Sequence, residues 1–140
     1  MRRILFLVSL LAIGAPALGT VDDAISRAME AINPYVKAGY IVRADQWGGD
    51  LGVREQKAIP HTLFKGNDYW FVMGTDADNA RVAIHVYDSR GNLVENDSWQ
   101  KGKYAAAHVL PGATGTYYII VEVTNSPEER THWAMVYGFK

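Results

Sequence analysis

From Gly39 to the C-terminus, apolar and polar residues alternate with a period of two, and this pattern constrains the fold more than any other feature of the sequence. Short segments rich in Val, Ile, Tyr, Phe and Trp are separated by turn-forming residues, as at 88–92 and 111–115. We expect eight strands, at residues 40–45, 59–64, 69–75, 81–88, 93–96, 103–109, 116–124 and 132–139. Short strands at this spacing predict a mainly β fold, an antiparallel β-sandwich or barrel.

The expected fourth strand shows how such a sheet divides its side chains. Val82, Ile84 and Val86 fall on one side, whereas His85 and Tyr87 fall on the other. Antiparallel sheets allow one face to be buried and the opposite face to meet water. We therefore expect one apolar interior and a partly polar outer surface.

Residues 20–38 have a different period. Apolar residues recur at spacings of three and four positions: Val21, Ile25, Ala28, Met29, Ile32 and Val36. This spacing predicts an amphipathic helix, with Thr20 as its N-cap, and Asn33-Pro34 is expected to end or kink it near Ile32. Such a helix can bind a partner or lie on a membrane, but docking on its own domain is the more common outcome, and we expect it here.

The N-terminal residues have the pattern of a secretory signal peptide. Arg2 and Arg3 precede an apolar run at 4–13, and small residues follow it. Cleavage is expected between Gly19 and Thr20, with cleavage after Ala17 as the alternative. The run is too short to cross a bilayer, which takes about 20 apolar residues. We predict a periplasmic or secreted protein with no membrane span after cleavage.

Composition limits the partners of the exported chain. Loss of Arg2 and Arg3 from the 14 basic residues leaves 12 against 15 acidic residues, a net charge of −3. This balance argues against nucleic acid as a partner, because nucleic-acid-binding domains present a basic face. Cysteine is absent, so the domain at 39–140 must be stabilised by its core and not by disulfides.

Three segments together resemble a known family. They are LFKGNDYWF at 63–71, the hairpin-like VAIHVYDSRGNLV at 82–94 and LPGATGTYYIIV at 110–121. In these segments the chain is similar to bacterial pre-peptidase C-terminal (PPC) domains. The resemblance implies a jelly-roll-like β-sandwich of secreted proteins, which serves attachment, substrate contact or stabilisation beside a peptidase. No peptidase accompanies the domain in this sequence, so the resemblance leaves its target open.

The residues needed for catalysis are not arranged in a recognisable motif. The chain has no cysteine and no G-x-S-x-G turn, and Ser98 has no nearby histidine on its N-terminal side. The four histidines (His61, His85, His108 and His132) are widely spaced and form no zinc-binding motif. We predict that the protein is not an enzyme and needs no cofactor.

Asp76 and Asp78 form an acidic loop between two expected strands. Calcium binds oxygen ligands supplied by such loops, and the PPC resemblance implies calcium binding in some relatives. The loop lacks the glycine and the distal glutamate of an EF-hand. A solvated turn rich in Asx residues is the competing interpretation.

Two tryptophans are candidates for ligand contact. Trp47 precedes Gly48-Gly49 and Trp99 follows Asp97-Ser98, so both are expected in loops. An exposed Trp in a β-sandwich can stack on a sugar ring, although packing within the loop is the alternative. Trp70 and Trp133 lie inside expected strands and are predicted to pack.

The sequence therefore predicts an exported, non-enzymatic binding or structural domain. It would present a sheet face or a loop edge to a protein or a polysaccharide. The alternatives are a small carbohydrate-binding module that uses Trp47 and Trp99, and a domain that binds calcium through Asp76 and Asp78.

Overall fold

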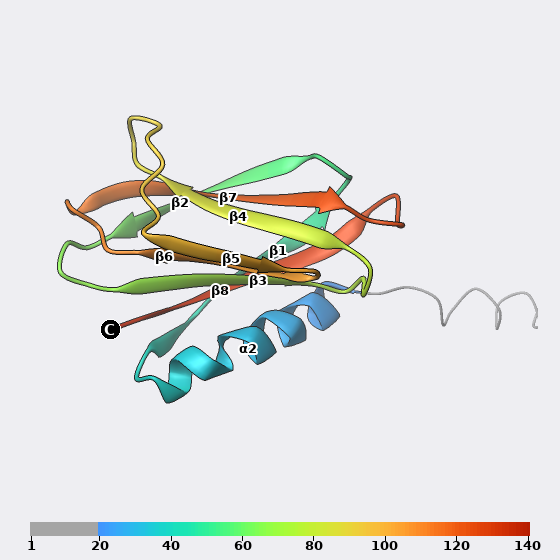
Figure 1. The fold of residues 1–140 in the computed structure, drawn as a ribbon, viewed down its shortest axis with the longest axis horizontal. Helices are drawn as coiled ribbons and strands as arrows, with labels where there is room; N and C mark the ends of the chain where they lie inside the picture. The colour runs from blue at the N-terminus through green and yellow to red at the C-terminus, as the bar shows by residue number, and fades with distance from the viewer. Residues whose placement is uncertain (1–19) are drawn as a thin grey trace, which may run out of the picture.

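The computed structural model describes residues 20–140, which form two antiparallel sheets and one helix stacked in three layers (Figure 1). The elements in chain order are α2 (Val21–Lys37), β1 (Ile41–Leu51), β2 (Gln56–Leu63), β3 (Tyr69–Thr75), β4 (Arg81–Tyr87), β5 (Asp97–Lys101), β6 (Tyr104–Val109), β7 (Gly115–Asn125) and β8 (Thr131–Phe139). The predicted mainly β sandwich with an N-terminal helix is confirmed. The predicted signal peptide at 1–19 lies outside the described residues.

The strands divide into a five-stranded sheet of order β1-β8-β3-β6-β5 and a three-stranded sheet of order β2-β7-β4. Apart from the β5–β6 hairpin, every connection between consecutive strands crosses from one sheet to the other. This alternation gives the chain a jelly-roll-like path. Among residues 20–140, no helix combines the length and the hydrophobicity that a membrane span requires.

The main core lies between the two sheets. Inward-facing side chains of β3 and β8 pack against those of β4 and β7, and the large ones are almost completely buried, among them Phe71, Met73, Ile84, Ile119 and Met135. The inward and outward residues alternate along β4 and β7 as the sequence predicted. Burial of these apolar side chains is the main stabilising contribution to the sandwich.

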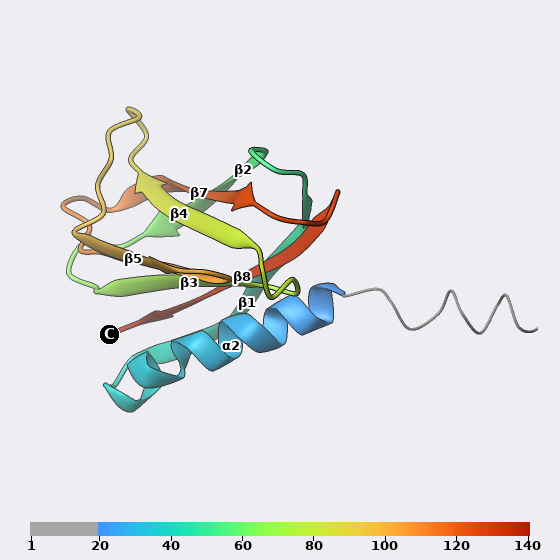
Figure 2. The same cartoon turned by 45° about the vertical axis from the view of Figure 1, so that its right-hand side comes forward.

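A second apolar cluster joins α2 to the outer face of the five-stranded sheet. Ala28 and Ile32 of the helix are fully buried against Val72 of β3 and Val136 of β8. A capping box starts the helix: the Asp23 amide donates to the Thr20 hydroxyl, and the Thr20 amide donates to the Asp23 carboxylate. The helix therefore docks on its own domain, as predicted (Figure 2).

Asn33-Pro34 does not end the helix near Ile32, because the helix continues through Pro34 to Lys37; a kink there, the alternative, stays a prediction. Tyr35, one residue after the proline, stacks on Trp70 of β3 with ring centroids 4.4 Å apart. This contact gives the last turn a tertiary partner, and packing of this kind overrides a weak local preference. The amide of Ala38 then donates to the Pro34 and Tyr35 carbonyls at the end of the helix.

The predicted strand at 93–96 is also wrong. Its residues form one isolated bridge, between Leu93 and Tyr87, and the strand in this region is β5 at Asp97–Lys101. The loop placement of both candidate tryptophans fails as well, because Trp47 lies within β1 and Trp99 within β5. Trp70 and Trp133 lie in strands and are buried, as predicted.

Candidate functional site

The outer face of the three-stranded sheet is the face that α2 leaves uncovered (Figure 1). Pro60 of β2 lies opposite Tyr118 of β7, and Tyr118 lies opposite Tyr87 of β4, so these three residues form a row across the sheet. The neighbouring row contains Ala58, Ile120 and His85. Tyr118 has 38% of its surface exposed. Tyrosine is enriched at protein interfaces, so this row, with Tyr118 exposed, is a candidate contact surface.

A loop at 88–92 projects from one end of this face, where it is the yellow segment after β4 in Figures 1 and 2. The Asp88 carboxylate accepts hydrogen bonds from the Arg90 and Asn92 amides, each at 2.9 Å. These bonds, chiefly the one from Asn92, lower the pKa of Asp88 and keep it charged. Gly91 has a φ of 84°, a conformation that suits glycine. The Asp88 side chain thus holds the turn in one shape by accepting hydrogen bonds from its backbone.

The segment that follows the loop is braced against the free edge of β4. The Glu95 carboxylate accepts a hydrogen bond from the Val86 amide at 3.0 Å and contacts the His85 Nδ1 at 2.8 Å. The Val94 amide donates to the Val86 carbonyl at 2.9 Å. These contacts cover the edge of the sheet, which would otherwise expose unpaired backbone groups. They also fix the direction in which the loop projects.

The braced loop stands between two shallow hollows. One, of about 460 Å³, lies on the uncovered sheet face and is lined by His85, Tyr87, Tyr118 and the loop. The other, of about 400 Å³, lies on the opposite side of the loop, beside residues 110–117. A rigid projection with an aromatic face at its base can enter a concave partner and contact the rim around it. We call the loop and this face the loop–face surface.

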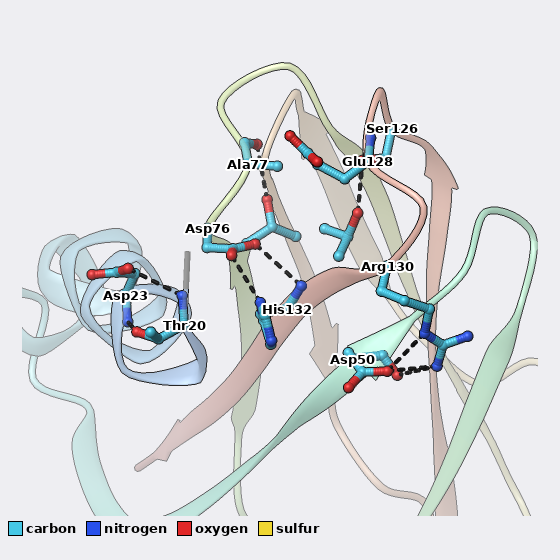
Figure 3. Close-up of polar contacts among 11 residues, drawn as sticks. Thr20, Asp23, Asp50, Asp76, Ala77, Ser126, Glu128, Arg130 and His132 are labelled. Atoms are coloured by element: carbon cyan, nitrogen blue, oxygen red, sulfur yellow. Dashed lines mark hydrogen bonds and ion pairs between the residues drawn. The ribbon is translucent and has the colours of Figure 1, made fainter. Parts of the chain in front are cut away.

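The remaining polar clusters connect structural elements. Figure 3 shows Asp76 accepting a hydrogen bond from the His132 amide and contacting its ring at Nδ1, at 3.1 and 2.9 Å. A catalytic triad would need a hydroxyl on the same histidine. The nearby Ser126 hydroxyl instead accepts from the Thr131 hydroxyl at 2.6 Å and from the Glu128 amide at 3.1 Å. The contacts between Asp76 and His132 therefore hold the end of β3 beside the start of β8.

At the end of the sandwich opposite the 88–92 loop (Figure 1), Arg130 joins two connections that cross between the sheets, and Figure 3 shows its contact with Asp50. Its guanidinium group donates to the Asp50 carboxylate at 2.6 and 2.8 Å and to the Glu55 carboxylate at 2.5 Å. These acceptors raise the pKa of Arg130, the Asp50 hydrogen bond most of all. The cluster holds the β1–β2 and β7–β8 connections together.

The predicted calcium ligands have other partners. Asp76 is engaged with His132, whereas Asp78 pairs with Lys103 at 3.0 Å and with Arg27 at 3.5 Å. The same contacts, led by the Lys103 hydrogen bond, lower the pKa of Asp78. Within the part of the chain that the structure describes, no three acidic or histidine side chains are grouped to hold a metal ion. Calcium binding by Asp76 and Asp78 stays an untested alternative.

The two candidate tryptophans pack in different clusters. Trp47 is half-buried beside the inter-sheet core, with its ring 5.3 Å from His61 and 5.9 Å from Tyr137. Trp99 packs on the helix side of the five-stranded sheet, where its Nε1 donates to the Tyr35 hydroxyl at 2.7 Å. The fold does not bring the two together in one site, and sugar binding by either of them stays a prediction.

Sequence reasoning identified the alternation of His85 and Tyr87 with buried residues but assigned no function to that face. The sequence analysis did not predict which sheet the helix covers, so it did not single out Tyr118 as exposed. The brace formed by Glu95 was hidden because its segment was predicted to be a strand. The turn at 88–92 was recognised from its residues.

No protein-family model matches this sequence, and no curated protein matches it. Two PliG proteins are among the solved structures that match. The chain superposes on PliG of Aeromonas hydrophila, a periplasmic lysozyme inhibitor of g-type lysozyme, with a TM-score of 0.50 and 15% identity, over 74% of this chain and 90% of that one. PliG of Salmonella Typhimurium, with the same description, gives a TM-score of 0.45 and 12% identity, over 69% and 86%. At these identities the likeness shows the fold alone, and the PPC resemblance stays a prediction.

Proposed function

We propose that this chain is an exported, non-enzymatic domain that binds a protein, and that its partner is a lysozyme of the g-type, which it inhibits in the periplasm. The observation that carries the proposal is the braced loop at 88–92 standing beside an uncovered aromatic sheet face. The fold likeness to PliG of Aeromonas hydrophila supports the choice of partner.

The shape and charge of the loop fit such a partner. An enzyme that hydrolyses a polysaccharide has a concave substrate cleft, and glycosidases commonly place two carboxylates in it. The loop is convex, and Arg90 is an exposed cation within it. Arginine pairs well with carboxylates because its planar guanidinium donates two parallel hydrogen bonds. The loop would block the cleft while Arg90 contacts an acidic group there.

The bracing of the loop also favours tight binding. A loop that is already ordered loses less conformational entropy when it binds than a mobile one does. Asp88 orders the turn and Glu95 fixes its base, so the bound shape exists before the partner arrives. Tyr118 and Tyr87 would then pack on the rim of the cleft.

The test is an inhibition assay with a g-type lysozyme acting on bacterial cell walls, together with a direct binding measurement. We expect the purified protein to inhibit and Arg90→Ala to weaken inhibition by about 10- to 100-fold, the size of an interface hot spot. Arg81→Ala is the matched control, because Arg81 is also exposed but lies at the opposite end of β4. It should inhibit like the unaltered protein.

A second variant separates the loop from the sheet face. Tyr118→Ala removes an exposed ring and should weaken inhibition while leaving the fold intact, as checked by circular dichroism. The absence of both inhibition and binding with g-type lysozyme would rule out this partner. If Arg90→Ala and Arg81→Ala weakened inhibition equally, the overall charge of the protein, and not the loop, would mediate the contact.

A further inference from the structure

A cleft of about 380 Å³ opens along the side of the sandwich where β1 and β2 lie. These are edge strands of different sheets, and they pair with β8 and β7 and not with each other. Four aromatic side chains line the cleft: Phe64, Tyr69, Tyr137 and Phe139. The volume lies within the range of small-molecule sites. This cleft is separate from the loop–face surface.

An irregularity in β1 places two charged residues at this cleft. The register of β1 with β8 shifts between Val42 and Gln46, so residues 43–45 have no ladder partner. Arg43 and Asp45, two positions apart in this bulge, both line the cleft. Bulges at sheet edges commonly direct side chains into binding sites.

Neither charge is neutralised by an ion pair within residues 20–140. Arg43 lies 5.7 Å from the centre of the Phe139 ring, and no acidic group is within salt-bridge distance of it in this part of the chain. Asp45 likewise has no basic partner there, in contrast to Asp50, which is paired with Arg130. Two opposite charges and an aromatic wall thus converge on one cleft without neutralising each other.

Two ionisable groups at the cleft respond to this environment. Burial lowers the pKa of His61, and the Asp45 charge opposes part of that effect. Burial also raises the pKa of Tyr137, and the negative charge of Asp45 adds to the shift. Asp45, which is itself exposed, is therefore near the partly buried His61 ring and the buried Tyr137 ring. Perturbed groups gathered in a cleft are a common property of binding sites.

We infer that this cleft binds an uncharged saccharide. A sugar hydroxyl both donates and accepts hydrogen bonds, so one ring can pair with the Arg43 guanidinium and the Asp45 carboxylate together. Its C–H face can pack on an aromatic side chain, and Phe64 presents a ring that is 54% exposed. The Asn67 and Thr62 side chains, which also line the cleft, add further polar contacts.

Other ligand classes fit less well. An anion would pair with Arg43 but be repelled by Asp45. A cation would pair with Asp45 but be repelled by Arg43. A wholly apolar ligand would bury both charges without partners, which is costly. A neutral polyhydroxylated ligand avoids both penalties.

The test is titration of the full exported protein with three uncharged trisaccharides (chitotriose, cellotriose and maltotriose), followed by NMR. We expect at least one of them to give saturable shifts at His61 and Tyr137 with a Kd below about 10 mM, the range of weak specific binding. Phe64→Ala should weaken that binding at least tenfold, as should Arg43→Ala. Ile41→Ala is the control, because Ile41 is 60% exposed on the same strand but does not line the cleft.

Three results would overturn the inference: no saturable shift at His61 with any of the three sugars, binding that survives Phe64→Ala, or saturable binding of citrate at the same residues. The result is independent of the proposed inhibition. Arg90→Ala should leave sugar binding unchanged, and Phe64→Ala should leave lysozyme inhibition unchanged.

Discussion

Replacing Gly74 with alanine tests how closely α2 is seated on the sandwich. A Cβ built on Gly74 lies 2.8 Å from the Ala28 amide nitrogen, 2.8 Å from the Arg27 Cβ and 3.0 Å from the Arg27 carbonyl carbon. Ordinary contact begins at 3.4 Å, so the helix and β3 must separate by about 0.6 Å. Two of the three atoms belong to the helix backbone, so no side-chain rotation relieves the clash.

The expected loss follows from two opposing effects. Overpacking a well-packed site costs about 1–3 kcal/mol. Alanine also lowers the conformational entropy of the unfolded chain. At a position whose backbone conformation alanine can adopt, this stabilises the folded state by about 0.4–1 kcal/mol. At the midpoints of these two ranges the effects differ by about 1.3 kcal/mol, so we expect Gly74→Ala to lower the free energy of unfolding by about 1–2 kcal/mol.

Urea unfolding followed by tryptophan fluorescence measures this change, and Gly115→Ala is the matched control. A Cβ on Gly115, the first residue of β7, meets nothing within 4 Å. Gly115→Ala should therefore be neutral or stabilise by up to about 1 kcal/mol. If Gly74→Ala differed from the unaltered protein by less than about 0.5 kcal/mol, the range of ordinary surface changes, the close seating of α2 would be refuted.

Three further predictions concern the loop, pH and metal. Glu95→Ala leaves the Val86 amide without its acceptor, so we expect a loss of about 1–3 kcal/mol and faster hydrogen exchange at 88–96; unchanged exchange would contradict the brace. Burial lowers the pKa of His61, so the folded state binds fewer protons than the unfolded one. Stability should therefore fall as pH drops through about 6.5, and His61→Gln should reduce that slope in unfolding curves at several pH values. Because Asp76 and Asp78 already have protein partners, we expect the same Tm in excess calcium and in chelator; a higher Tm with calcium would show a site at this loop.

The sandwich was predictable because alternation is set by burial, and burial depends on side chains that the sequence displays. Strand limits were less predictable where local preference and pairing disagree. Residues 93–96 contain Leu and Val and resemble a strand, yet they brace the edge of β4. Residues 97–101 look like a polar loop, yet they form β5, an edge strand that pairs with β6. Strand preference depends on context, and here the context is the partner strand.

Gly48-Gly49 was misleading for a related reason. A glycine pair commonly indicates a loop, so Trp47 was placed in one. In the structure these glycines lie within β1, and a Cβ on Gly48 would be 2.7 Å from the Val21 side chain and 3.2 Å from the Trp133 carbonyl. Gly48 leaves room for the Val21 side chain at the start of the helix. This proximity depends on tertiary packing, which local sequence does not report.

The location of the candidate site depends on which outer face receives the helix, and small side chains decide it. Facing α2, the central strands of the five-stranded sheet carry Gly74, Ala106 and Ala134, which let the helix backbone come within contact distance. The central strand of the other sheet presents Tyr118 and Glu122 outward, and neither would allow a helix so close. The sheet with small outward residues is therefore closed by the helix. The sheet with large, polar and aromatic outward residues stays open beside the loop at 88–92. If α2 were moved to the open face, its alanines would have no matching surface, and the binding face that we propose would be lost.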